Sequence, residues 1–342
     1  MTGSRHKIIG GMFGLELPFT QPVGGWELPN GSLLLCNARS AFRMIIQKIN
    51  PARILLPSYF CPTMLQGVPG EFKNRISYYG VDSALNIEGK SLESVLAEDL
   101  IVLIDYFGWP APRDLIVELQ RKGAVVLEDA CQVLPGALNT PADFLLFSPR
   151  KYFGVPDGAI LISREEINVG CWDMQPVPHD WWSKSLRASI LRHDFDLGTS
   201  SREWFELFQQ CELNPPIGPF RMSELSRSFL TYAFDPIRIA AKRKENYSRL
   251  YKEFSEFAVL GPLPDSVVPL GFPMCVPNRP HVLERLFAEE IYPAVHWPIT
   301  GVVPEEFRSS HNLSTQIMTL PCDQRYEDGD IARMIAALHA FL

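Results

Sequence analysis

The sequence lacks the features that mark several large classes of protein. Its seven Cys residues form no CxxC pair and stand at no zinc-binding distance from His, which argues against a zinc site. No apolar run approaches the length of a membrane span, and the N-terminus shows no long apolar region of the kind a secretory signal needs. A net charge of −7 argues against a nucleic-acid partner, because no basic excess exists to neutralise phosphates.

These absences favour a globular protein of a reducing compartment, and we expect a cytoplasmic location without membrane contact. An odd number of scattered Cys residues indicates buried free thiols. The chain is 46% hydrophobic and 21% charged, which is ordinary for a globular protein. Its 29 Pro residues accompany no low-complexity block, so they indicate well-defined loops.

In the first half of the chain, short apolar runs alternate with helical segments. Strands are predicted over 33–36, 53–57, 75–82, 100–108, 124–130, 144–148 and 158–163. Helices are predicted over 41–49, 58–68, 91–99 (with Ser91 as N-cap) and 112–123. Such alternation is typical of a mostly parallel sheet covered on both faces, so the predicted fold class is a three-layer α/β/α domain.

The second half is less regular at first and then predicts a small α+β unit at its C-terminal end. Helices are expected over 179–195, 201–211, 281–290 and 326–342, with a long helical stretch over 221–254 kinked at Pro236. Strands are expected over 267–276, 293–298 and 316–321. The predicted division is an N-terminal arm over 1–31, a large domain over 32–235 and a small C-terminal domain over 236–342.

An acid and a lysine follow two of the predicted strands. Asp129 ends the run 124–130, and Lys151 lies just after 144–148. Functional residues collect at the carboxyl ends of parallel strands, so the two side chains can share a pocket. This is the pair that an enzyme using pyridoxal 5′-phosphate (PLP) needs. The alternatives are a strand-end acid that caps a helix and a lysine in a surface turn.

A possible anion site lies where the first helix opens. Asn37, Ala38, Arg39 and Ser40 follow a buried strand, and a helix N-terminus favours bound phosphate. The segment carries neither a GxGxxG nor a GKS motif, which argues against dinucleotides and P-loop nucleotides. The alternative is ordinary N-capping by Asn37.

The order of these pieces resembles one known family across nearly the whole chain. The matching segments are IGGMFGLEL (9–17), LLCNARSAF (34–42), ILLPSYFCPT (54–63), DYFG (105–108), LEDACQ (127–132), FSPRK (147–151), GVPDGAIL (154–161), RMSEL (221–225) and LPCDQRY (320–326). They resemble the DegT/DnrJ/EryC1/StrS group of sugar aminotransferases among the fold-type I PLP enzymes. The acid-to-lysine spacing of 22 residues is the most specific part.

The resemblance implies a role for each matched cofactor residue. Lys151 would be the Schiff-base lysine, Asp129 would pair with the pyridine nitrogen, and Gln132 would hydrogen-bond the phenolic oxygen. Ala38, Arg39 and Ser40 would bind the phosphate. The ring-stacking residue falls in the segment Tyr59-Phe60-Cys61, where the alignment favours Cys61 and we choose Phe60.

The sequence departs from the family at two phosphate positions. Leu146 stands where many members have a serine, so Ser148 or Arg221 would complete the phosphate site. Pro219 stands where many members have an asparagine that reaches the partner subunit.

Three further residues are substrate candidates. Tyr106 follows a predicted strand near the expected pocket, His296 lies in the predicted small domain, and Arg221 matches the family position already described. The alternatives are a strand-end turn for Tyr106 and a structural role for His296 beside a Trp.

The resemblance implies an aminotransferase that moves an amino group from an amino acid, with glutamate expected, to a keto group of a nucleotide-linked sugar. It also implies PLP as cofactor, a homodimer with shared active sites, and a role in nucleotide-sugar and polysaccharide biosynthesis. Elimination or dehydration on the same scaffold is the first alternative. A non-catalytic regulatory or assembly relative is the second.

Overall fold

The centre of the molecule is a seven-stranded sheet in the order β2-β8-β7-β6-β5-β3-β4. The computed structural model describes residues 7–16, 31–135, 140–164 and 173–342. The strands are β2 (Leu33–Leu35), β3 (Arg53–Pro57), β4 (Ile76–Tyr79), β5 (Asp99–Ile104), β6 (Val125–Asp129), β7 (Phe144–Phe147) and β8 (Ala159–Ser163). Strands β4, β3, β5, β6 and β7 pair in parallel, whereas β8 is antiparallel to β7 and β2. The mostly parallel sheet is therefore confirmed.

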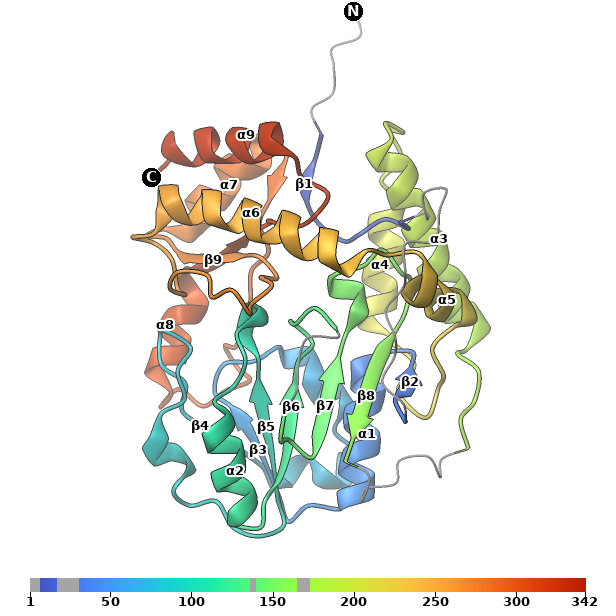
Figure 1. Cartoon of the computed structure of the whole chain (residues 1–342), viewed down its shortest axis with the longest axis vertical. Coiled ribbons are helices and arrows are strands. Elements are labelled where there is room, and N and C mark those ends of the chain that lie inside the picture. The colour runs from blue at the N-terminus through green and yellow to red at the C-terminus, as the bar shows by residue number, and fades with distance from the viewer. Residues whose placement is uncertain (1–6, 17–30, 136–139, 165–172) are drawn as a thin grey trace, which may run out of the picture.

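Helices cover the two faces of this sheet. In Figure 1, α1 (Ala38–Ile49) lies behind the strands and α2 (Arg113–Arg121) lies in front of them. Every residue of β5 is buried, as expected for a central strand covered on both faces. Helix α1 begins at Asn37, whose side chain accepts a hydrogen bond from the Ser40 N–H group, and it ends at Asn50 in a left-handed conformation.

Four helices follow the sheet. They are α3 (His179–Asp196), α4 (Glu203–Leu213), α5 (Glu224–Tyr232) and α6 (Pro236–Phe254). The prediction of one kinked helix over 221–254 is wrong, because α5 and α6 are separate. Asp235 caps α6 by accepting hydrogen bonds from the N–H groups of Ile237 and Arg238, and Pro236 occupies the first turn, where it costs no hydrogen bond.

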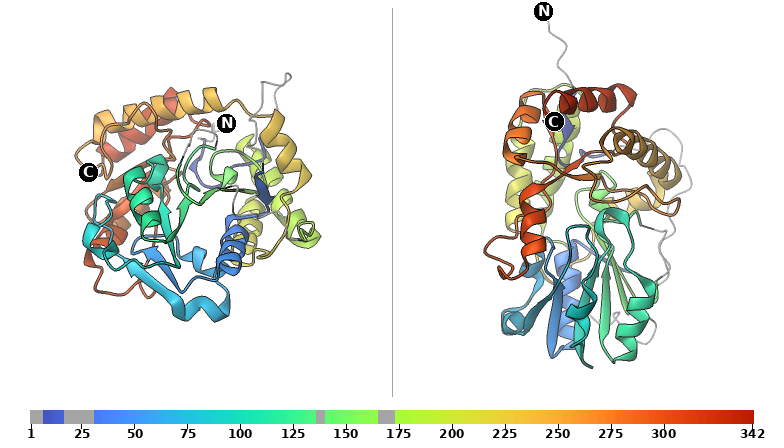
Figure 2. Two further views of the ribbon diagram at one scale, coloured as in Figure 1. Left: turned by 60° about the horizontal axis from the view of Figure 1, so that its bottom comes forward. Right: turned by 90° about the vertical axis from the view of Figure 1, so that its left-hand side faces the viewer.

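The C-terminal part lies beyond the carboxyl ends of the parallel strands, and α6 crosses above the sheet (Figures 1 and 2). Its elements are β9 (Phe272–Cys275), α7 (Arg279–Ala288), β10 (Ile291–Tyr292), α8 (Arg308–Gln316), β11 (Ile317–Leu320) and α9 (Asp328–His339). Strands β9 and β11 pair antiparallel, and β1 (Ile9–Gly10) pairs in parallel with β10. A separate apolar cluster that includes Tyr247, Phe272 and Met318 forms its core.

Several local predictions do not hold. The segment 91–99 is no helix: a 3₁₀ turn at Gly89–Leu92 begins after Glu88 rather than at Ser91, and β5 already starts at Asp99. No strand spans 293–298, where a single bridge joins Ala294 to Thr319. By contrast, the loop and short helix expected over 58–68 are present, as a bend followed by the 3₁₀ helix Pro62–Gly67.

The predicted N-terminal arm is only partly described. Residues 1–6 and 17–30 lie outside the described residues, while 7–16 run beside the C-terminal part (Figure 1). Among the described helices, none combines the length and apolar character that crossing a bilayer requires.

Candidate active site

Two cavities meet at the carboxyl ends of β6 and β7. The smaller, of about 170 Å³, lies against the start of α1, and the larger, of about 370 Å³, lies between α3, α4, the N-terminal segment and the C-terminal part. Arg150, Lys151 and Glu212 line both cavities. The wall between the two cavities is therefore charged.

Asp129 and Lys151 come together in the smaller cavity. Asp129 is the last residue of β6, and Lys151 ends a 3₁₀ turn directly after the neighbouring strand β7. The Asp129 Oδ1 atom accepts a hydrogen bond from the Cys131 N–H group at 3.0 Å, which orients the carboxylate. The Lys151 Nζ atom makes no hydrogen bond or ion pair with any residue that the structure describes. The amine is thus available at the junction of the two cavities.

The smaller cavity also contains several of the predicted phosphate residues. Ala38, Arg39 and Ser148 line it, and so does Leu146. Ala38 and Arg39 occupy the first two positions of α1, where backbone N–H groups have no partner within the helix. One end of the cavity is therefore a helix N-terminus.

Gln132 follows the lining residue Cys131 but lines neither cavity among the described residues, and one of its hydrogen-bonding groups is unsatisfied. Its Oε1 atom accepts from the Phe107 N–H group at 2.8 Å, and its backbone carbonyl accepts from the Tyr152 hydroxyl at 2.7 Å. Its Nε2 atom is buried and has no partner among the described residues. An unpaired buried donor costs about 1–3 kcal/mol, so an acceptor from a bound molecule would stabilise it.

The arginines at the cavity junction hold a carboxylate, and we call Arg39, Arg150 and Glu212 the junction cluster. Both terminal nitrogens of Arg150 donate to Glu212 Oε1 at 2.9 Å, and Arg39 Nη2 donates to Glu212 Oε2 at 3.1 Å. Arg39 Nη1 also donates to Gln66 Oε1 at 2.8 Å and to the Glu212 carbonyl at 3.1 Å. Burial acts to raise the pKa of Glu212, but the two guanidinium groups lower it below its ordinary value. Neither Arg150 nor Glu212 was predicted as a site residue. Arg150 is adjacent to Lys151, which was a usable signal, whereas no local pattern marks Glu212.

Ser40 does not lie where the phosphate prediction requires. It is fully buried, and its hydroxyl donates to the Pro216 carbonyl at 3.2 Å and accepts from the Gly218 N–H group at 3.2 Å. Asn37 donates to the same Pro216 carbonyl at 2.7 Å. The Ser40 side chain therefore holds the loop around Pro216 instead of facing the cavity.

The choice of Phe60 as the ring-stacking residue does not fit its position. Phe60 is fully buried in the main core and packs against Tyr78 with ring centroids 6.1 Å apart. The adjacent Cys61 lines the smaller cavity, as do Phe42 and Met64. Phe60 lies in the bend that precedes Cys61, and of the two residues only Cys61 lines the cavity.

His296 lines the larger cavity, as expected of a substrate-side residue. Its Nδ1 atom lies 2.8 Å from the Thr319 hydroxyl. Burial and the nearby Lys151 charge lower the pKa of His296 to about 3, so the imidazole is neutral at neutral pH. It can therefore exchange hydrogen bonds with a substrate but brings no positive charge.

Two substrate candidates lie elsewhere. The Tyr106 hydroxyl donates to the backbone carbonyl of Tyr59, and its ring is buried beside Trp297. Arg221 is exposed, and its backbone forms a bridge with Leu35 at the edge of the sheet. Neither side chain lines the two cavities formed by the described residues.

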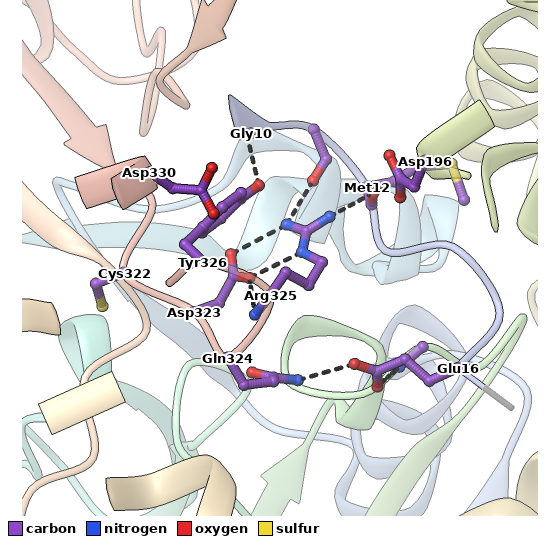
Figure 3. Close-up of polar contacts among 12 residues, drawn as sticks. Gly10, Met12, Glu16, Asp196, Cys322, Asp323, Gln324, Arg325, Tyr326 and Asp330 are labelled. Atoms are coloured by element: carbon purple, nitrogen blue, oxygen red, sulfur yellow. Dashed lines mark hydrogen bonds and ion pairs between the residues drawn. The ribbon is translucent and has the colours of Figure 1, made fainter. Parts of the chain in front are cut away.

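A second arginine on the wall of the larger cavity fastens the N-terminal segment. We call Asp323, Arg325 and the backbone carbonyls of Gly11 and Met12 the strap cluster. Figure 3 shows the Arg325 guanidinium between these groups. Arg325 Nε donates to Asp323 Oδ1 at 2.8 Å, Nη1 donates to the Met12 carbonyl at 3.0 Å, and Nη2 donates to the Gly11 carbonyl at 3.2 Å.

Neighbouring contacts reinforce this attachment (Figure 3). The Gly10 N–H group donates to the Tyr326 hydroxyl at 2.7 Å, and Gln324 Nε2 donates to Glu16 Oε1 at 3.2 Å. Gly10 has a φ of 105°, and a Cβ atom there would lie 2.1 Å from the Tyr292 carbonyl oxygen, so the close approach requires glycine. The N-terminal segment is therefore a fixed wall of the larger cavity.

Comparison with solved structures identifies the fold. No protein-family model and no curated protein matches the chain. A DegT DnrJ EryC1 StrS aminotransferase from Brucella abortus is similar, with a TM-score of 0.63, 18% identity, and coverage of 91% of this chain and 85% of that chain. A putative sugar aminotransferase from Streptococcus pneumoniae, seen in apo, PMP and PLP forms, has in its apo form a TM-score of 0.62, 12% identity, and coverage of 90% and 85%. DesV from S. venezuelae has a TM-score of 0.62, 14% identity, and coverage of 91% and 84%. At these identities the likeness establishes a shared fold, and the predicted fold class is confirmed.

Proposed function

We propose that this chain is a PLP-dependent aminotransferase. It would move an amino group from an amino acid, with glutamate as the expected donor, to a keto group of a nucleotide-linked sugar. The observation that carries the proposal is the Lys151 amine, which has no partner among the described residues, at the junction of two cavities, with the Asp129 carboxylate in the smaller one. The shared fold with structures described as sugar aminotransferases supports it.

The groups around the smaller cavity fit the chemistry of PLP. Asp129 offers a carboxylate for the ring nitrogen and Lys151 offers an amine for the aldehyde. Gln132, next to the lining residue Cys131, has a buried N–H donor that finds no partner among the described residues. When bound, PLP accepts into its pyridine ring the electrons of a broken Cα–H bond. The Cys131 N–H group fixes the Asp129 carboxylate, which would keep a proton on the ring nitrogen.

Lys151 would act first as the Schiff-base lysine and then as a base. Once a substrate amine has displaced it, the free Nζ atom can carry a proton between the substrate carbon and the cofactor carbon. Its place on the wall of both cavities suits this second role, because substrate would enter through the larger cavity.

The lining of the larger cavity supports a sugar as acceptor. It combines aromatic side chains, Phe13, Phe208 and Tyr292, with polar groups that include the His296 imidazole and the Arg150 and Lys151 side chains. Such a mixture suits a ring that has an apolar face and several hydroxyls. We extend the proposal to a homodimer with shared sites and to a role in nucleotide-sugar and polysaccharide biosynthesis.

Borohydride reduction tests the proposed cofactor linkage. The protein is incubated with PLP, reduced, digested and examined by mass spectrometry, and we expect one pyridoxyl phosphate adduct, on Lys151. Lys151→Ala should lose both the adduct and the visible absorbance, while Lys184→Ala, a change of an exposed lysine on α3, should keep both. An adduct on another lysine, or none, would contradict the proposal and favour a non-catalytic role.

Product analysis tests the reaction. The protein with PLP is supplied with glutamate and a panel of keto-sugar nucleotides and simple 2-oxo acids. We expect an amino sugar and 2-oxoglutarate in equal amounts. Turnover of 2-oxo acids alone would remove the sugar from the proposal, and release of ammonia instead of amino transfer would favour elimination.

A further inference from the structure

The junction cluster places two guanidinium groups at one end of the smaller cavity. Arg39 comes from the first turn of α1, Arg150 from the turn before Lys151, and Glu212 from the last turn of α4. Three elements distant in sequence thus meet at one point, and the Glu212 carboxylate takes three guanidinium hydrogen bonds.

The groups around the junction cluster favour the binding of an anion that carries more negative charge than one carboxylate does. Two arginines face one Glu212 carboxylate, and the positive end of the α1 dipole adds to them. The Arg150 Nε atom is buried and has no partner among the described residues. A phosphate monoester has three acceptor oxygens, so it can satisfy more of these donors than a carboxylate can.

The position of Glu212 allows its carboxylate to move away from the two arginines. Its side chain remains 31% exposed, and its position in the last turn of α4 sets a negative charge at the negative end of a helix dipole. Arg39 keeps its bonds to Gln66 and to the Glu212 backbone carbonyl when the carboxylate moves. The arginines therefore need not rearrange to accept another anion.

We propose that Arg39 and Arg150 form a phosphate-monoester site, which takes the phosphate of PLP, and that Glu212 competes with the phosphate for the same N–H groups. The assignment to PLP rests on the proposed function. The two arginines supply donors to a cavity in which Leu146 offers none, and the Ser148 hydroxyl lines the same cavity. Glu212 thereby weakens phosphate binding and sets the affinity of the site.

Glu212→Gln tests the competition. The dissociation constants of PLP, pyridoxal and inorganic phosphate are measured by titration calorimetry for the wild type and the variant. We expect Glu212→Gln to bind PLP and inorganic phosphate at least about tenfold more tightly, the worth of one charge-assisted hydrogen bond, with no change for pyridoxal. Glu206→Gln makes the same charge change at an exposed position of α4 and should leave all three constants unaltered.

The outcomes separate this proposal from the enzyme proposal. Unchanged or weaker phosphate binding by Glu212→Gln overturns the competition, whether or not Lys151 forms its adduct. Tighter inorganic phosphate binding without any Lys151 adduct keeps the anion site and removes the aminotransferase.

A crystal structure of the wild type grown with PLP gives a readout independent of the variant's folding. We expect the Glu212 carboxylate to lie beyond hydrogen-bond distance of Arg150, with phosphate oxygens in its place. Retained Arg150–Glu212 bonds beside a bound phosphate would overturn the proposal.

Discussion

Two arginine–carboxylate clusters line the larger cavity, and they differ in what else the arginines bind. In the strap cluster, Arg325 bonds Asp323 and two backbone carbonyls, and the side chains of this pair are 15% and 8% exposed. In the junction cluster, Arg150 bonds only the Glu212 carboxylate among the described residues, and its Nε atom has no partner.

The comparison indicates that an arginine–carboxylate ion pair can either join two segments of the chain or hold a site for an anion. An arginine such as Arg325, four of whose five N–H groups bond the protein's own carboxylate and carbonyl groups, joins segments and has little capacity for a ligand. An arginine that is held by one partly exposed carboxylate can exchange that carboxylate for another anion. We therefore expect stability to depend on the strap cluster and anion binding to depend on the junction cluster.

The largest effect should follow removal of the strap arginine. Arg325→Met leaves the buried Asp323 carboxylate without its cation and releases the carbonyls of Gly11 and Met12, so the free energy of unfolding should fall by about 3 kcal/mol or more. Urea denaturation measures this change in the free energy of unfolding. Arg238→Met, at an exposed position of α6, is the control and should stay within about 0.5 kcal/mol of the wild type. A change no larger than the control's would show that the strap cluster does not fasten the segment.

Removal of the junction arginine should act on binding instead. Arg150→Met deletes two donors from the proposed phosphate site, so the dissociation constant of PLP should rise about tenfold. The free energy of unfolding should change by less than about 1 kcal/mol, because Glu212 stays paired with Arg39 and remains partly exposed. Arg308→Met, an exposed position in α8, is the matched control. A stability loss as large as that of Arg325→Met would erase the distinction between the clusters.

The smallest expected effect is a loss of stability at acidic pH. The arginines lower the pKa of Glu212 and of Asp323 below their ordinary values of 4.5 and 3.8. Each ion pair therefore contributes stability that is complete above the ordinary pKa and is lost as pH falls through the lowered one. The stability difference between the wild type and Glu212→Gln should be constant from pH 7 to about 5. It should then shrink by less than about 1 kcal/mol below pH 4.5, since the pair is partly exposed.

Urea denaturation over a pH series measures this difference. Asp323→Asn should show a larger loss, confined to lower pH, because Asp323 is the more buried carboxylate. The Glu206→Gln control should show no such window. A Glu212 difference that shrinks already between pH 7 and 5 would contradict the lowered pKa.

The sequence allowed the sheet and the proximity of Asp129 and Lys151 to be predicted because both depend on short-range patterns. The apolar runs that form β5, β6 and β7 are uninterrupted, so each is recognisable on its own. Asp129 and Lys151 follow two of those runs, and parallel pairing brings them to one edge.

The sequence-based predictions failed where contacts with a neighbouring element outweigh the local conformational preference of a segment. The segment 91–99 has a helical composition, but the Asp99 carboxylate accepts bonds from Leu96 and Arg53 and starts β5 there. Phe60 was preferred for its aromatic ring, yet it lies in the bend over 58–60 and packs against Tyr78. The ring therefore lies in the core, and Cys61 reaches the cavity.

The sequence by itself determined which segments form the strands, the cap at Asn37 and the acid and lysine at adjacent strand ends, because these follow from local patterns and from the pairing of the neighbouring strands β6 and β7. The pairing of β2 with β8, which are far apart in the sequence, depended on the tertiary structure. Only the tertiary structure decided that Glu212 meets Arg39, 173 positions away, and Arg150, 62 positions away. The end of α4 reaches the start of α1 through packing of whole helices, and no local pattern of charge encodes which arginine a distant carboxylate will find.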